Sequence, residues 1–140
     1  MKTGPIVLVE DDFDDKKFFE VALTDLKVPN KLLWFDNCHE ALDYLKTTEE
    51  KPFLIFSDIN LPLQTGIEFK RDIDADPELR KKSIPFIFYS TSVNQQAVND
   101  AYLKITVQGY FEKPDQYKGV VNTLNVIIDY WKVCIHPNSK

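Results

Sequence analysis

The chain has 140 residues, of which 44% are hydrophobic and 28% are charged, and its formal net charge is −5. A chain of this length can bury roughly two-thirds of its unfolded surface, enough for one compact domain without a structural metal or disulfides. The acidic balance excludes the basic stripe that nucleic-acid binding needs, and the apolar runs are too short to span a bilayer.

The amino terminus carries no small-residue cleavage site after its apolar stretch, so we expect no signal peptide and a cytoplasmic protein. Two cysteines, Cys38 and Cys134, stand outside any CxxC or Cys/His pattern and are expected to be reduced thiols. No linker or shift in composition divides the chain. We therefore expect a single domain over residues 1–140, with no output domain.

Five short apolar runs alternate with amphipathic stretches, a pattern typical of a parallel sheet with helices on both faces. The runs predict strands at residues 6–9, 31–35, 53–57, 86–89 and 109–112. The fold class that this alternation indicates is α/β, with a doubly wound five-stranded parallel sheet in the order 2-1-3-4-5, a flavodoxin-like (βα)5 arrangement.

The stretches between the runs predict helices. The first follows the acidic residues 10–15, and the second begins after Asn37, a predicted N-cap. Residues 67–75 form the third, which Asp76 and Pro77 break or restart. The fourth covers residues 95–103. Apolar side chains at helical spacing predict two buried stripes, which are Phe18, Phe19, Ala22, Leu23 and Leu26 in the first helix, and Val120, Leu124, Ile127, Ile128, Trp131 and Ile135 in the last.

Acidic residues follow the first and third predicted strands. Asp11 and Asp12 come after the first, and Asp58 comes directly after the third. These strands are neighbours in the predicted order, so the three carboxylates converge at the carboxyl edge of the sheet. Carboxylates that close repel one another unless a cation is bound, and oxygen ligands suit Mg²⁺. A solvated acidic loop that binds nothing is the simpler alternative for the residues after the first strand.

Lys113 follows the fifth strand, and Ser90 or Thr91 follows the fourth. Each alone has a simpler explanation, a surface turn for the lysine and a helix cap for the hydroxyl. However, an acidic pair, a central aspartate, a hydroxyl and a lysine each follow a different predicted strand, in chain order. This conjunction favours one site in which Asp58 accepts a phosphoryl group.

With these residues the chain resembles, over nearly its whole length, the response-regulator receiver domains of two-component signalling. Asp11 and Asp12 in the segment VLVEDD match the family's acidic pair. The segment SDINLPLQTG matches the family's phosphoacceptor loop, and its Asp58, Pro62 and Gly66 have the family's spacing.

The end of the chain carries the rest of the resemblance. Lys113 and Pro114 match the Lys-Pro after the fifth strand, a bond that the family usually holds cis. Tyr110 matches the aromatic residue three positions before that lysine. Counting forward from the fourth strand favours Ser90 as the family's hydroxyl, whereas counting back from Lys113 favours Thr91.

The resemblance implies that Asp58 takes a phosphoryl group from a phosphohistidine of a histidine kinase or phosphotransfer protein. The chain would then be no enzyme beyond its own phosphorylation and autodephosphorylation. Mg²⁺ would be held by Asp12, Asp58 and the backbone carbonyl of Asn60, with Asp11 acting through water. Lys113 and the hydroxyl of Ser90 would pair with phosphoryl oxygens.

The resemblance also implies a conformational switch. Ser90 would move toward the phosphoryl group, and Tyr110 would turn inward. The face formed by the fourth helix, fifth strand and fifth helix would then change shape for a downstream protein, unless the phosphoryl group is passed on in a phosphorelay. The expected state is a monomer or a phosphorylation-dependent dimer, without nucleic acid or membrane insertion.

Three alternatives stay open. A pseudo-receiver would use the same fold as a docking module without phosphorylation. A haloacid-dehalogenase-type phosphatase is suggested by Asp12-Phe13-Asp14, although Lys16 stands where that family has Thr or Val. A flavodoxin-like flavin binder would need a first loop rich in Ser, Thr and Gly, whereas this loop is acidic.

Overall fold

A computed structural model describes residues 2–91 and 94–137 of the chain. Its strands are β1 (Ile6–Val9), β2 (Leu32–Phe35), β3 (Leu54–Ser57), β4 (Phe86–Ser90) and β5 (Gly109–Glu112). They form one parallel sheet in the order β2-β1-β3-β4-β5, which confirms the predicted doubly wound topology. Because β1 lies beside β3, the loops that leave these two strands meet at one edge of the sheet.

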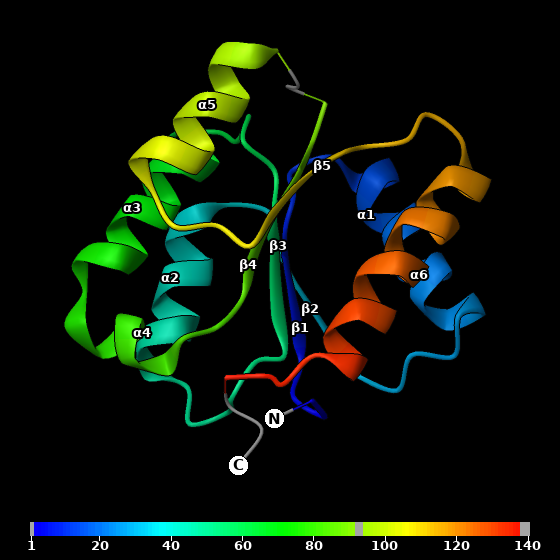
Figure 1. The fold of residues 1–140 in the computed structure, drawn as a ribbon, viewed down its shortest axis with the longest axis horizontal. Helices are drawn as coiled ribbons and strands as arrows, with labels where there is room; N and C mark the ends of the chain where they lie inside the picture. Colours follow the sequence, from blue (N-terminus) through cyan, green and yellow to red (C-terminus); the bar gives the residue numbers. More distant parts are fainter. Residues whose placement is uncertain (1, 92–93, 138–140) are drawn as a thin grey trace.

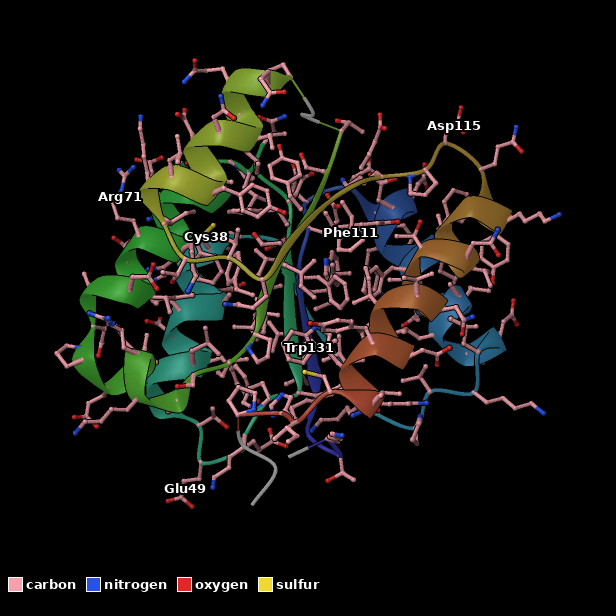
Figure 2. All side chains as sticks on the ribbon, viewed as in Figure 1. Cys38, Glu49, Arg71, Phe111, Asp115 and Trp131 are labelled. Carbon is pink, nitrogen blue, oxygen red and sulfur yellow. The ribbon has the colours of Figure 1, made fainter. Side chains whose placement is uncertain are left out.

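Helices cover both faces of the sheet (Figure 1). One face carries α1 (Phe13–Asp25) and α6 (Tyr117–Val133), and the other carries α2 (Cys38–Thr47), α3 (Gly66–Ala75), α4 (Pro77–Lys82) and α5 (Gln95–Lys104). Figure 2 shows Phe111 and Trp131 on the side of α6 and Cys38 on the side of α2. The core is therefore divided into two apolar layers by the sheet.

The three central strands explain why their sequences are continuously apolar. Every residue of β1, β3 and β4 is buried, because helices pack on both sides. Successive side chains alternate between the layers, so Leu8 and Phe56 face α1 and α6, whereas Val7 and Ile55 face the other helices.

The predicted break at Asp76 and Pro77 is confirmed, and the part of the chain that the structure describes therefore has six helices. The Asp76 side chain accepts hydrogen bonds from the backbone amides of Glu78 and Leu79, and Pro77 opens α4. The predicted N-cap at Asn37 is also confirmed by its bond from the Glu40 amide. Among the described helices, none has the length and apolarity that a membrane crossing requires.

Two residues of the predicted stripes are exposed. Phe18 is 46% exposed, and its ring lies 6.1 Å from that of Tyr117 at the start of α6. Ile135 is 88% exposed, because α6 ends at Val133 and Cys134 is extended. His136 is the buried residue of that segment instead.

The expected cis bond before Pro114 is not present. All peptide bonds between described residues are trans, including Lys113–Pro114. Trans is the isomer that X–Pro bonds prefer by about 0.5–1 kcal/mol, and the family's usual geometry is thus not met here.

Candidate functional site

Asp58 lies where β3 ends, and its carboxylate is held from two sides. Its Oδ1 accepts hydrogen bonds from the backbone amides of Ile59 at 2.6 Å and Asn60 at 3.4 Å. Its Oδ2 accepts one from Lys113 Nζ at 2.7 Å. The residue is only 7% exposed, so these partners fix its orientation at the edge of the sheet.

Gly66 keeps the loop after Asp58 closed. Its amide donates to the Ile59 carbonyl at 2.8 Å, and a Cβ at this position would come within 2.1 Å of the Asp58 carbonyl oxygen. Only glycine fits such a close backbone approach without a shift. The spacing between Asp58 and Gly66 therefore has a steric basis in this structure.

Lys113 lies among carboxylates from three segments of the chain. Its Nζ is 2.5 Å from Glu10 Oε1, 2.7 Å from Asp58 Oδ2 and 2.9 Å from Asp15 Oδ2. Burial alone would lower the pKa of Lys113, but the hydrogen bonds to Asp58, Glu10 and Asp15 outweigh it and raise that pKa above its ordinary value. The predicted Asp58 and Lys113 are thus brought together, with the lysine charged.

The acidic pair at the site is Glu10 and Asp11 rather than the predicted Asp11 and Asp12. Carboxylate oxygens of Glu10, Asp11 and Asp58 lie within 4.8 Å of one another. Asp12 points elsewhere, because it is the N-cap of α1 and its Oδ1 accepts from the Asp15 amide at 3.0 Å. The structure therefore places Glu10, and not the predicted Asp12, in the carboxylate cluster.

Glu10 is held more tightly than its position in an acidic loop suggests. Its amide donates to the Phe35 carbonyl, its carbonyl accepts from Trp34 Nε1 at 2.7 Å, and its Oε2 accepts from the Asp12 amide. Burial raises the pKa of Glu10 to about 7, although the neighbouring Lys113 ammonium opposes that rise. A carboxylate kept in such a place is poised to bind a cation.

The donor set fits a hard divalent metal. Three carboxylates offer oxygen atoms only, from two adjacent strand ends, and a Mg²⁺ ion prefers such ligands together with retained water. Asp11 is exposed, which leaves one side of the cluster open to solvent. Glu10, Asp11 and Asp58 are therefore the residues that would hold the ion.

Ser90 and Thr91 differ in burial. Ser90 is the last residue of β4 and fully buried, and its carbonyl accepts from the Lys113 amide at 3.0 Å. Thr91 is exposed just beyond the strand. The backbone of Ser90 is therefore bonded to that of Lys113 within the sheet, whereas Thr91 lies outside it.

Tyr110 lies half-buried in β5, one strand farther from Asp58. Its ring is 5.8 Å from that of Phe88, on the side of the sheet that carries α5. Burial and, to a lesser degree, the Asp58 charge raise the pKa of the Tyr110 hydroxyl. Tyr110 is thus near enough to Asp58 for the two to interact electrostatically.

Comparison with known proteins agrees with this geometry. The family described as the response regulator receiver domain matches residues 6–125. The response regulator Rcp1 of Synechocystis sp. is 28% identical over 131 residues, which cover 90% of this chain and 87% of Rcp1.

Two crystal structures are similar throughout. The phosphorylated cyanobacterial phytochrome response regulator RcpA superposes with a TM-score of 0.86 at 28% identity, covering 96% of this chain and 98% of RcpA. The Mn²⁺-bound form of Rcp1 gives a TM-score of 0.80 at 27% identity, covering 94% of this chain and 97% of Rcp1.

Proposed function

This chain belongs to the response regulator receiver domain family, and we propose that it is a signalling switch in which Asp58 accepts a phosphoryl group from a phosphohistidine. The family consists of signalling modules of two-component systems rather than conventional enzymes. The donor would be a histidine kinase or a phosphotransfer protein. The phosphorylated form of RcpA and the Mn²⁺-bound form of Rcp1 support this proposal by similarity.

The observation that carries the proposal is the setting of Asp58. Two backbone amides hold Oδ1, and a buried lysine ammonium holds Oδ2. Phosphoryl transfer depends mostly on positioning and on neutralising charge, because the transition state is loose and highly anionic. A fixed carboxylate beside a fixed cation supplies both requirements.

The transfer follows from these contacts. A carboxylate oxygen of Asp58 forms a bond to phosphorus while the bond from phosphorus to the histidine nitrogen breaks, and the electron pair of that bond leaves with the imidazole. Lys113 then offsets the charge of a phosphoryl oxygen, and the Ser90 hydroxyl donates to another. Glu10, Asp11, Asp58 and the backbone carbonyl of Asn60 would hold Mg²⁺, which when bound neutralises phosphoryl charge.

The output would come from the face formed by α5, β5 and α6. Ser90 and Tyr110 link Asp58 to this face, because β4 pairs with β5 and Tyr110 contacts Phe88. Contacts that Ser90 and Lys113 make only with a phosphoryl group can shift an equilibrium between two conformations. A downstream protein, or a second copy of the chain, would bind one of them.

The match of residues 6–125 to the receiver domain family weighs against the phosphatase alternative. To distinguish the phosphorylated switch from the docking-only alternative, the protein is incubated with Mg²⁺ and acetyl phosphate, and its intact mass is measured. We expect an added mass of one HPO₃ group in the wild type and none in Asp58→Asn. A wild-type protein that gains no mass with this donor or with a phosphorylated histidine phosphotransfer domain would leave docking as the function.

A further inference from the structure

Lys113 has one carboxylate partner that the acidic cluster does not include. Of its three partners, Glu10 and Asp58 belong to the cluster that would hold a metal. The third, Asp15, comes from the first turn of α1 and accepts a hydrogen bond from Lys113 Nζ at 2.9 Å. The sequence separates these two residues by 98 positions, and only the fold brings them together.

We propose that Asp15 is a positioning residue, which holds Lys113 in the site while the metal ion and the phosphoryl group engage Glu10 and Asp58. The inference rests on the proposed phosphorylation of Asp58 and adds a residue to it. Asp15 touches neither the phosphoryl group nor the metal and acts through Lys113 alone.

The charge balance at Lys113 is the first argument. The lysine side chain is only 7% exposed, and a buried ammonium is stable only with anionic partners. A bound metal ion would draw Glu10 and Asp58 toward itself, and phosphorylation would convert one oxygen of Asp58 into the bridging oxygen of an acyl phosphate. Among the three carboxylate partners of Lys113 in the described residues, Asp15 is the one that neither event would engage.

The position of Asp15 is the second argument. The Asp15 amide donates to the N-cap side chain of Asp12 at 3.0 Å, which fixes the first turn of α1 and with it the direction of the Asp15 side chain. The side chain is 37% exposed and reaches Lys113 from the side of α1. It therefore steadies the ammonium from outside the metal cluster.

The environment of Tyr89 agrees with this placement. Burial raises the pKa of Tyr89, the Lys113 charge opposes that rise, and the charges of Asp15 and Glu10 add to it. Tyr89 packs in the layer beneath α1 and α6. Lys113, Asp15 and Glu10 therefore gather on that side of the sheet edge.

The test uses Asp15→Asn with Asp14→Asn as the matched control. Asp14 lies one position earlier on the same helical turn, is exposed, and carries the same charge. We expect Asp15→Asn to slow phosphorylation by acetyl phosphate about tenfold, the loss of one charge-assisted hydrogen bond, and Asp14→Asn to change it less than about twofold. In a Lys113→Gln background, Asp15→Asn should have no further effect.

Two further measurements separate positioning from other roles. The Mg²⁺ affinity of Asp15→Asn should stay within about threefold of the wild type, whereas Asp11→Asn should lose affinity at least about tenfold. Asp15→Glu should recover part of the phosphorylation rate. If Asp15→Asn lost Mg²⁺ affinity as Asp11→Asn does, Asp15 would be a metal ligand, and the inference would be wrong.

A thermal double-mutant cycle decides the inference even if the protein takes no phosphoryl group. The melting-temperature shifts of Asp15→Asn and Lys113→Gln should be less than additive, and more so with saturating Mg²⁺ than without it. Additive shifts, or a coupling that disappears in Mg²⁺, would overturn the inference. An absent mass gain in the wild type would instead count against the phosphorylation of Asp58.

Discussion

Four of the five acidic residues at positions 10–15 have three different roles, although their chemistry is nearly the same. Glu10 and Asp11 lie in the cluster with Asp58, Asp12 caps α1, and Asp15 binds Lys113. The end of β1 at Val9 decides this division, because it makes Glu10 the first residue that turns into the site. If the sequence were shifted by one residue relative to the end of β1, a different acidic residue would cap α1 and a different one would join the cluster.

Glu10→Gln and Asp12→Asn test that division directly. We expect Glu10→Gln to weaken Mg²⁺ binding about tenfold, because a neutral amide replaces a buried carboxylate of the cluster. Asp12→Asn should leave the affinity within about twofold, since asparagine is an equally good N-cap. Trp34 fluorescence can report the titration, because its indole nitrogen donates to the Glu10 carbonyl.

The reverse order of effects would contradict the assignment. A loss of affinity in Asp12→Asn with none in Glu10→Gln would return Asp12 to the metal. The melting temperature of both variants serves as the control, so that a loss of folded protein is not taken for a loss of binding.

The residues that the sequence could predict are those with a fixed position relative to a strand end. Asp58 and Lys113 each follow an apolar run whose end is clear, and both lie in the site. The acidic pair was misplaced because three acids follow β1 without a break. A signal was present, since Asp12 followed three residues later by Asp15 resembles a capping sequence. Nothing local predicts that Asp15 meets Lys113.

The elements that connect the site to the surface are β4, β5 and α5. β4 ends in Ser90, and β5 pairs along it with Tyr110 opposite Phe88. The turn before β5 lacks glycine and is closed by side chains instead. Gln108 Oε1 accepts from the Phe86 amide, and Thr106 Oγ1 donates to Asp74. This edge of the sheet is therefore tied to both β4 and α3.

Tyr110→Ala tests whether this edge reports phosphorylation. We expect its phosphorylation rate to stay within about twofold of the wild type, since the proposed transfer uses Asp58, Lys113 and Ser90 and not Tyr110. Hydrogen exchange of residues 109–112 should respond to phosphorylation in the wild type and much less in Tyr110→Ala. Tyr102→Ala, an exposed aromatic on α5, is the control.

An unchanged exchange response in Tyr110→Ala would remove Tyr110 from the switch. The strands and most helices of this region could be predicted from apolar runs and breakers such as Pro77. The helix ends and the side-chain closure by Gln108 could not, because their partners lie on other strands.

Across the molecule, His136 connects the segment after α6 to Phe53, the residue that precedes β3. Its Nε2 lies 2.6 Å from the Phe53 carbonyl oxygen, and its ring makes a tilted contact with Phe53 and an edge contact with Trp131. Burial lowers the pKa of His136, and the bond to the Phe53 carbonyl partly opposes that effect. The folded protein therefore favours the neutral imidazole.

Because folding lowers the pKa of His136, the stability that this residue contributes depends on pH. A histidine with a lowered pKa contributes stability above its ordinary pKa of 6.5 and loses it as the pH falls through the folded-state value. We expect His136→Gln to lower the melting temperature by roughly 3 °C at about pH 8 and by less at about pH 5.5. Glu10, whose pKa is raised, has the opposite dependence, but it is common to both proteins and cancels in their difference.

A difference in melting temperature that does not vary with pH would contradict the buried neutral histidine. Sequence patterns did not suggest His136, because helical spacing pointed to Ile135 instead. The end of α6 at Val133 reverses which of these two neighbours is buried.

Chemical trapping shows directly whether Asp58 carries the phosphoryl group. Borohydride reduces an aspartyl phosphate to homoserine, so the protein is treated with Mg²⁺ and acetyl phosphate, reduced and mapped by peptide mass spectrometry. We expect homoserine at residue 58 alone, and none when Mg²⁺ is chelated. Homoserine at residue 11 or 12, or at no position in a wild-type protein that binds Mg²⁺, would contradict it.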